Sequence, residues 1–138
     1  MTARADSGGD RPMITRVPSP STGQRAWLAG DAAEDIVARH YERRGYALDR
    51  RRWRGRGGEI DLILRRGALV VFVEVKQSRD FARAAQSLRP AQMQRLLQSA
   101  EDFLGGEPCG SLTECRFDVA FVDGGGICEI VENALGQG

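Results

Sequence analysis

Residues 68 to 75 form a nearly unbroken apolar run, ALVVFVEV, near the middle of the chain. The run is rich in β-branched residues, which favours a strand, and it is far shorter than the roughly 20 apolar residues that a bilayer span needs. A strand that is apolar on both faces has to be covered on both faces, as the inner strands of α/β sheets are. This run therefore predicts the central strand of a buried sheet.

The segments around this strand predict two helices and four more strands. Apolar residues at helical spacing predict helices over Trp27–Arg44 and Pro90–Leu104, each followed by a glycine. A period of two predicts strands over Tyr46–Trp53 and Glu59–Leu64, and two further strands are expected around the glycines at 124–126, over Arg116–Val122 and Ile127–Val131. The order α-β-β-β-α-β-β predicts an α/β fold with a mixed central sheet flanked by helices, because the second helix crosses over to a returning strand.

The composition and the ends of the chain set the domain organisation. The 138 residues suffice for one domain, and 41% hydrophobic with 28% charged residues is typical of a soluble globular protein. Residues 1–22 are polar and contain scattered Pro, Gly and Ser, which predicts a disordered tail before a single domain at 23–135. Three cysteines without a CxxC pair and one histidine argue against a disulfide framework or a Cys/His zinc site. With no signal segment and no membrane span, the expected location is the cytoplasm.

A hairpin is predicted from the strand Glu59–Leu64, a turn at Arg65–Gly67 and the central strand. Alternation along the first of these strands places its apolar residues on one face, namely Ile60, Leu62 and Leu64. In such a hairpin, Asp61 and Glu74 come from adjacent strands.

Charged residues end the buried strand, where an unpaired charge is costly. Glu74 and Lys76 are two residues apart, as are Glu59 and Asp61, so each pair is expected to share a face of the sheet. Two carboxylates beside a lysine suit a divalent cation such as magnesium, which prefers oxygen ligands. The alternative is a cross-strand salt bridge without catalysis.

Lys76 is the sole lysine, because the other nineteen basic residues are all arginine. Codon usage can explain the excess of arginine, but it does not explain why a lysine stands at this position. A lysine ammonium is compact and can orient a water nucleophile or balance charge on a phosphate. This favours a catalytic role for Lys76.

Arginines also cluster just before the carboxylates, with Trp53 among them. A basic patch with an interleaved aromatic residue predicts a track for a nucleic-acid backbone, formed by Arg50, Arg51, Arg52, Arg54 and Arg56. The alternative is a solvated edge strand whose charges prevent aggregation.

Two further acids have two interpretations each. Glu34 lies at the margin of the apolar face of the first helix, so it either faces the sheet or completes a capping box with Asp31. Asp118, inside a predicted strand, is expected to form a structural salt bridge with an arginine rather than to act in catalysis.

Two segments, Gly57–Ile63 (GGEIDLI) and Val71–Lys76 (VFVEVK), resemble the paired signature of the YraN family of small bacterial proteins. Other segments agree with the family, so that the resemblance covers about residues 23–135; they are Gly30–Tyr41, Arg95–Ala100, Cys115–Val119 and Asn133–Leu135. The family often has a lysine early in the second helix, where this chain has Gln92. The resemblance implies a restriction-endonuclease-like fold of the PD-(D/E)xK superfamily, similar to archaeal Holliday-junction resolvases.

The same resemblance implies a magnesium- or manganese-dependent nuclease acting on DNA, including branched or junction DNA, and it is compatible with a homodimer. Asp61 and Glu74 would hold the metal with the Val75 carbonyl, and Glu34 would hold a second metal or a metal-bound water. Lys76 would position the attacking water. The alternative is a non-catalytic nucleic-acid-binding protein on the same fold.

Overall fold

The computed structural model describes residues 30–77 and 89–134, and these contain two α-helices and five strands. In chain order the elements are α1 (Gly30–Glu42), β1 (Ala47–Gly55), β2 (Gly58–Arg66), β3 (Leu69–Gln77), α3 (Pro90–Leu104), the 3₁₀ turn η1 (Gly110–Leu112), β4 (Cys115–Val122) and β5 (Cys128–Val131). The predicted order of elements is confirmed, with ends that differ by a few residues. The expected helix residues 27–29, the tail 1–22 and both ends of the expected domain lie outside the described residues.

All five strands form one mixed sheet in the order β1-β2-β3-β4-β5. The pairs β1–β2, β2–β3 and β4–β5 are antiparallel, and β3–β4 is parallel. The parallel pair arises because α3 carries the chain back across the sheet between β3 and β4. β3 is the middle strand, and its residues 70–73 are at most 1% exposed, which confirms the burial expected of the apolar run.

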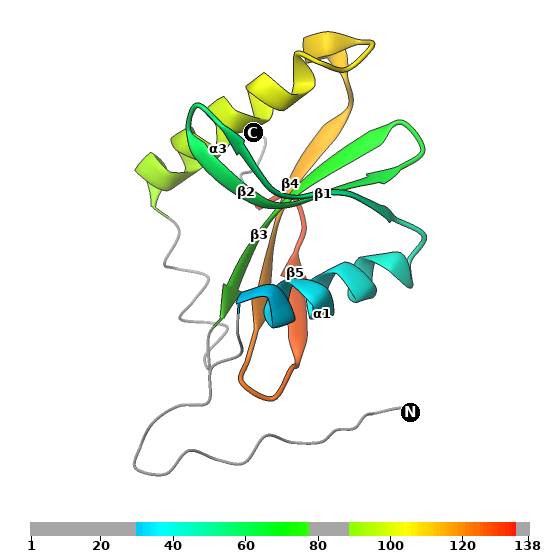
Figure 1. Ribbon diagram of the computed structural model, residues 1–138, viewed down its shortest axis with the longest axis vertical. Helices are drawn as coiled ribbons and strands as arrows, with labels where there is room; N and C mark the ends of the chain where they lie inside the picture. The colour runs from blue at the N-terminus through cyan, green and yellow to red at the C-terminus, as the bar shows by residue number, and fades with distance from the viewer. Residues whose placement is uncertain (1–29, 78–88, 135–138) are drawn as a thin grey trace.

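The two helices cover opposite faces of the sheet (Figure 1). α1 buries Val37 and Tyr41 against Leu62, Leu64 and neighbouring residues of β3 and β4. α3 packs on the other face, with its apolar residues Leu96, Ala100 and Phe103 against Ile63 and Phe72. Neither helix is long and apolar enough to cross a membrane, a finding that concerns the described residues alone.

The prediction that Ile60 shares a face with Leu62 and Leu64 is wrong. Ile60 packs in the cluster beneath α3, whereas Leu62 and Leu64 pack beneath α1. The change of face lies between Ile60 and Leu62, opposite the part of β1 that contains Arg52, whose φ of 52° is in the left-handed region. The expected turn at Arg65–Gly67 is also displaced, because β2 continues to Arg66 and Gly67 adopts a φ of 61°.

The glycine-rich β1–β2 hairpin is held against α3. A Cβ on Gly57 would lie 1.9 Å from the carbonyl oxygen of Arg95, so only glycine allows this approach. The Ser99 hydroxyl accepts a hydrogen bond from Gly57 N–H (3.0 Å) and donates one to the Gly58 carbonyl (2.8 Å). The hairpin therefore fixes the position of α3 over the sheet.

Candidate functional site

The carboxylate of Asp61 bridges β2 and β3 where their backbone pairing stops. The register of this pair ends at Leu62↔Val73. Beyond that point the Val75 N–H donates a hydrogen bond of 2.8 Å to Oδ2 of Asp61 instead of to a β2 carbonyl. This places Asp61 beside the end of the central strand, as the hairpin predicted.

Glu74 and Lys76 lie on one face of β3, as expected from their spacing. The Lys76 Nζ is 3.5 Å from Oε2 of Glu74, and the Gln92 Nε2 donates a hydrogen bond of 3.0 Å to the same oxygen. The Glu74 side chain is 15% exposed and that of Lys76 is 25% exposed. Gln92 belongs to the first turn of α3, so α3 closes this side of the group.

Burial and the closeness of the two carboxylates shift their pKa values. Burial and the nearby Asp61 carboxylate raise the pKa of Glu74 to about 7, although Lys76 acts in the opposite direction. Burial also raises the pKa of Asp61 above its ordinary value, although the Val75 N–H favours the ionised form. A cation between the two groups would therefore lower the cost of ionising them.

The oxygens present at this point are of the kind that magnesium prefers. Asp61 and Glu74 supply two carboxylates, and the Val75 carbonyl points to the same side of β3 as the Val75 N–H, because both groups of a residue in an extended strand do. Within residues 30–77 and 89–134 no three His, Cys, Asp or Glu side chains converge as a metal cluster. Magnesium is commonly held by one or two carboxylates with waters and substrate phosphate, and this donor set matches that pattern.

Glu34 faces the sheet from α1 and is 6% exposed. Its two carboxylate oxygens accept hydrogen bonds from the Arg52 Nε at 3.1 and 3.3 Å. Burial and the Asp61 carboxylate raise the pKa of Glu34, and Arg52 opposes them. Among the described residues, no hydrogen bond joins its side chain to the backbone of Asp31, so the arrangement differs from a capping box.

The arginines of the predicted track have different partners. Four of the five are engaged with acids: Arg50 with Asp49 at 3.3 Å, Arg51 with Asp35, Arg52 with Glu34, and Arg56 with Asp102 at 2.9 Å and Glu101 at 3.2 Å. Arg54 forms no ion pair in the described part of the chain. The run is therefore divided between acids of α1, α3 and β1 itself.

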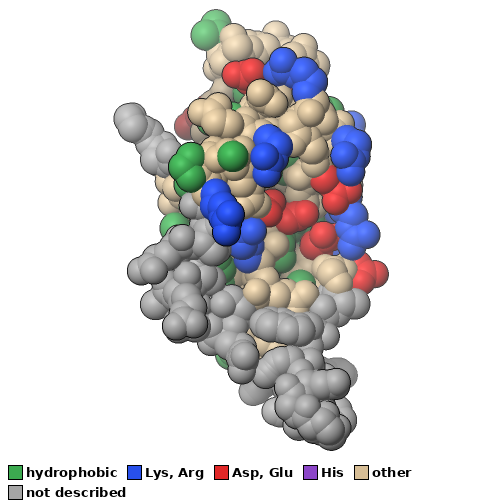
Figure 2. Space-filling model, turned by 90° about the vertical axis from the view of Figure 1, so that its left-hand side faces the viewer, with side chains coloured by type: hydrophobic (Ala, Val, Ile, Leu, Met, Phe, Trp, Pro, Cys, Tyr) green, Lys and Arg blue, Asp and Glu red, His purple; other side chains and the backbone are tan. Residues whose placement is uncertain are grey.

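The side of the molecule that carries this group has a mixed charge pattern. Acidic side chains gather at the centre of this face, and Lys and Arg side chains surround them (Figure 2). The first turns of α1 and α3 both lie toward this side, as does the end of β3 (Figure 1). Helix N-termini favour anions.

Asp118 has the structural role that its place in the strand predicted. It is 1% exposed and accepts hydrogen bonds from Arg116 Nε at 2.8 Å and Arg116 Nη2 at 2.9 Å. The Tyr41 hydroxyl adds a bond of 2.6 Å, which links α1 to β4. This carboxylate is fully paired, in contrast to the pair at Asp61 and Glu74.

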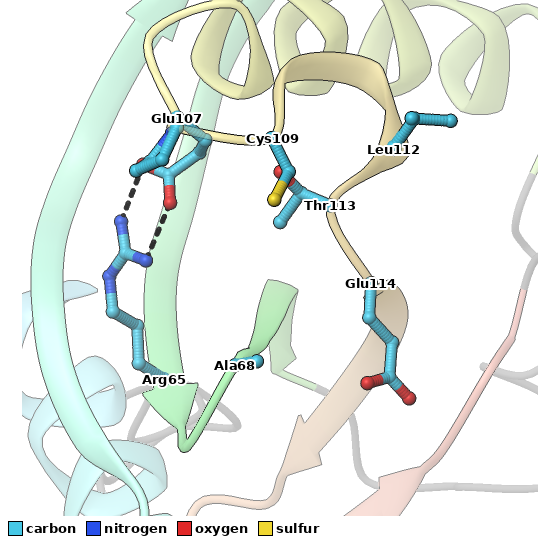
Figure 3. Close-up of a pocket in the computed structure, with 8 residues that line it drawn as sticks. Arg65, Ala68, Glu107, Cys109, Leu112, Thr113 and Glu114 are labelled. Atoms are coloured by element: carbon cyan, nitrogen blue, oxygen red, sulfur yellow. Dashed lines mark hydrogen bonds and ion pairs between the residues drawn. The ribbon is translucent and has the colours of Figure 1, made fainter.

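A cavity of about 440 Å³ lies at the other end of β3 (Figure 3). Arg65 and Glu107 form part of its wall and are joined by two hydrogen bonds of 2.7 Å. None of the residues predicted for catalysis or nucleic-acid binding lines it. This cavity is therefore separate from the candidate site.

Gln92 is the residue of the site that the sequence motifs did not assign. The sequence feature that could have identified Gln92 is helical spacing, because it lies four residues before the buried Leu96 and seven before the buried Ser99. A polar residue on that stripe, at the first turn of a helix packed on the sheet, faces the strand ends. Here it orients Glu74.

Comparison with known proteins agrees with the motifs. The model of the uncharacterised protein family UPF0102 matches residues 33–122. A UPF0102 protein of Ruegeria pomeroyi is 68% identical over 86% of this chain and 96% of its own length. Relatives from Roseobacter denitrificans and Cereibacter sphaeroides are 52% and 53% identical over 91% and 83% of this chain, and over 100% and 97% of their own lengths. The chain belongs to UPF0102, the YraN family.

Proposed function

We propose that this member of the UPF0102 family is a magnesium-dependent nuclease that hydrolyses phosphodiester bonds in DNA, with branched and junction DNA as the first substrates to test. The observation that carries the proposal is the meeting of Asp61, Glu74 and Lys76 at the end of the central strand. When both are ionised, the two carboxylates outnumber the single ammonium in a half-buried group. A divalent cation and a phosphate would complete it.

Each residue has a distinct task in this proposal. Asp61, Glu74 and the Val75 carbonyl hold the metal, which when bound supplies Lewis-acid polarisation of the phosphate and a more acidic water. The Lys76 ammonium, held beside Glu74, donates hydrogen bonds to the attacking water and to the developing charge on the phosphate. Gln92 keeps the Glu74 carboxylate oriented. Glu34 is assigned to a second metal or to a metal-bound water, for which its bond to Arg52 would have to open.

The second candidate is a nucleic-acid-binding protein that does not cleave. The observation that favours it is the ion pair between Lys76 and Glu74, because a lysine engaged in this way can serve as a structural partner only. The two candidates differ in the metal. A binding protein has no use for a divalent cation at Asp61 and Glu74, whereas a nuclease requires one.

A cleavage assay tests the proposal. Labelled linear, flapped and four-way DNAs are incubated with the wild-type protein in magnesium or manganese, beside Glu74→Gln. Glu114→Gln is the matched control, because Glu114 is an exposed acid that precedes β4 beside the opposite end of β3. We expect metal-dependent cleavage by the wild type and Glu114→Gln and none by Glu74→Gln. Absence of cleavage of every substrate with both metals would refute the nuclease and favour the binding protein.

A further inference from the structure

We propose that the nucleic-acid backbone is held by two exposed arginines that form no ion pair with a described residue, Arg54 on β1 and Arg95 on α3, and not by the whole arginine run of β1. The inference rests on the proposed function and specifies its substrate-binding surface. It adds α3 to a surface that the sequence pattern confined to residues 50–56.

Most of the arginine run is already neutralised within the fold. Arg52 is bonded to a Glu34 side chain that is only 8% exposed, and Arg51 to Asp35 on the same helix. Arg56 is held by two acids of α3. If one of these arginines turned toward a phosphate, it would leave its carboxylate without a partner, and for a buried carboxylate this is costly. Arg52 is therefore held in place by a buried acid, whereas Arg51 and Arg56 fasten β1 to the helices through exposed, weaker pairs.

Arg54 is the exception within the run. Its side chain is exposed and forms no ion pair with any described residue. In the β1–β2 register, Arg54 lies opposite Glu59. Glu59 stands two residues before Asp61 on β2. Trp53 packs on the α3 side of the hairpin, so the alternation of β1 directs Arg54 to the α1 side. Arg54 thus places an exposed guanidinium, without an ion pair to any described residue, on β1 near the stretch of β2 that leads to Asp61.

Arg95 is its counterpart on the other face. It is exposed, and it too lacks an ion pair in the described part of the chain. Its carbonyl lies against Gly57 at the tip of the hairpin, which fixes its place. It follows Gln92 by three residues, so the two side chains are neighbours on α3, and Gln92 contacts Glu74. The Arg95 guanidinium therefore lies on α3 within about one helical turn of Gln92, which contacts Glu74.

The two arginines lie on opposite faces of the hairpin whose second strand carries Asp61. A phosphodiester chain that brings one phosphate to Asp61 and Glu74 would meet repulsion from these acids, and neighbouring phosphates would need compensating cations. Arg54 and Arg95 provide them without breaking an ion pair among the residues that the structure describes. The pattern of basic side chains around central acids in Figure 2 is consistent with this arrangement.

DNA binding without metal tests the inference separately from catalysis. Fluorescence anisotropy of a labelled four-way junction and a linear duplex is measured in EDTA over a salt series, with wild type, Arg54→Ala and Arg95→Ala. Each substitution should weaken binding at least about threefold and reduce the slope of log affinity against log salt by about one. Arg39→Ala is the matched control, because Arg39 is an exposed arginine in the last turn of α1. Arg51→Ala should change affinity less than twofold.

The outcomes separate the inference from the proposed function. If Arg51→Ala weakens binding while Arg54→Ala and Arg95→Ala match the Arg39→Ala control, the β1 run carries the DNA and the inference is wrong, and this result does not contradict the nuclease proposal. If the wild type binds neither DNA at low salt, both the inference and the nucleic-acid function are overturned. Arg54 and Arg95 are exposed and unpaired in the described structure, so their variants should melt within about 1 °C of wild type.

Discussion

Replacing Glu74 with glutamine should stabilise the metal-free protein at pH 8. Burial beside Asp61 raises the pKa of Glu74 from 4.5 to about 7. One pKa unit corresponds to about 1.4 kcal/mol, so the ionised carboxylate costs the folded protein about 3 kcal/mol at high pH. Because the folded state binds the extra proton between pH 4.5 and 7, the stability of the wild type falls as pH rises through this window. Because glutamine does not ionise, Glu74→Gln removes this loss of stability with rising pH.

Urea unfolding in EDTA at pH 8 and pH 5 measures the effect. Glu74→Gln should be more stable than wild type by about 1–3 kcal/mol at pH 8 and similar to it at pH 5, where wild-type Glu74 is already protonated. Magnesium should stabilise the wild type and leave Glu74→Gln unchanged. Asp118→Asn is the matched control, a carboxylate-to-amide change in a neighbouring strand that should destabilise. A loss of more than about 1 kcal/mol in Glu74→Gln at pH 8 would refute the reasoning, because Glu74 would then be a structural partner of Lys76.

Three other substitutions test the site and its supports. Gln92→Ala should weaken magnesium affinity by about tenfold, measured by the metal-induced rise in melting temperature, because it frees the Glu74 carboxylate; an unchanged affinity would remove Gln92 from the site. Tyr41→Phe should cost about 1.5–3 kcal/mol in urea unfolding, since it leaves the buried Asp118 short of a donor, and a cost near zero would contradict that role. Gly57→Ala should cost about 1–3 kcal/mol because its Cβ would meet the Arg95 carbonyl, and Gly106→Ala, whose nearest neighbour would be 3.7 Å away, is the control.

The elements of the fold were predictable because each has its own hydrophobic period. The run at 68–75 and the stripe of α3 identified the central strand and one covering helix directly from the sequence. The face of Ile60 was not predictable, because the change of face opposite Arg52 follows from how β1 and β2 pair and not from residue type. A strict alternation rule fails wherever such an irregularity occurs.

The site was predictable to the extent that its residues are close in sequence. Glu74 and Lys76 are neighbours on one strand, and a hairpin brings Asp61 to them. The partners of the arginines were not predictable, because Asp35 lies 16 residues from Arg51 and Asp102 lies 46 residues from Arg56. Pairing over such separations depends on the three-dimensional packing of both helices, so a charge run alone does not distinguish free arginines from engaged ones.

Single-turnover cleavage by Lys76 variants tests the central claim most directly. With excess protein and saturating magnesium on the best substrate, Lys76→Ala should reduce the rate of the chemical step by about 10²–10³, because it removes a preorganised charge from the developing negative charge. Lys76→Arg should not restore the rate, since the guanidinium is larger and planar, and both variants should bind DNA in EDTA as wild type does. If Lys76→Ala cleaves at the wild-type rate, or if Lys76→Arg does so, Lys76 is not the group that positions the attacking water.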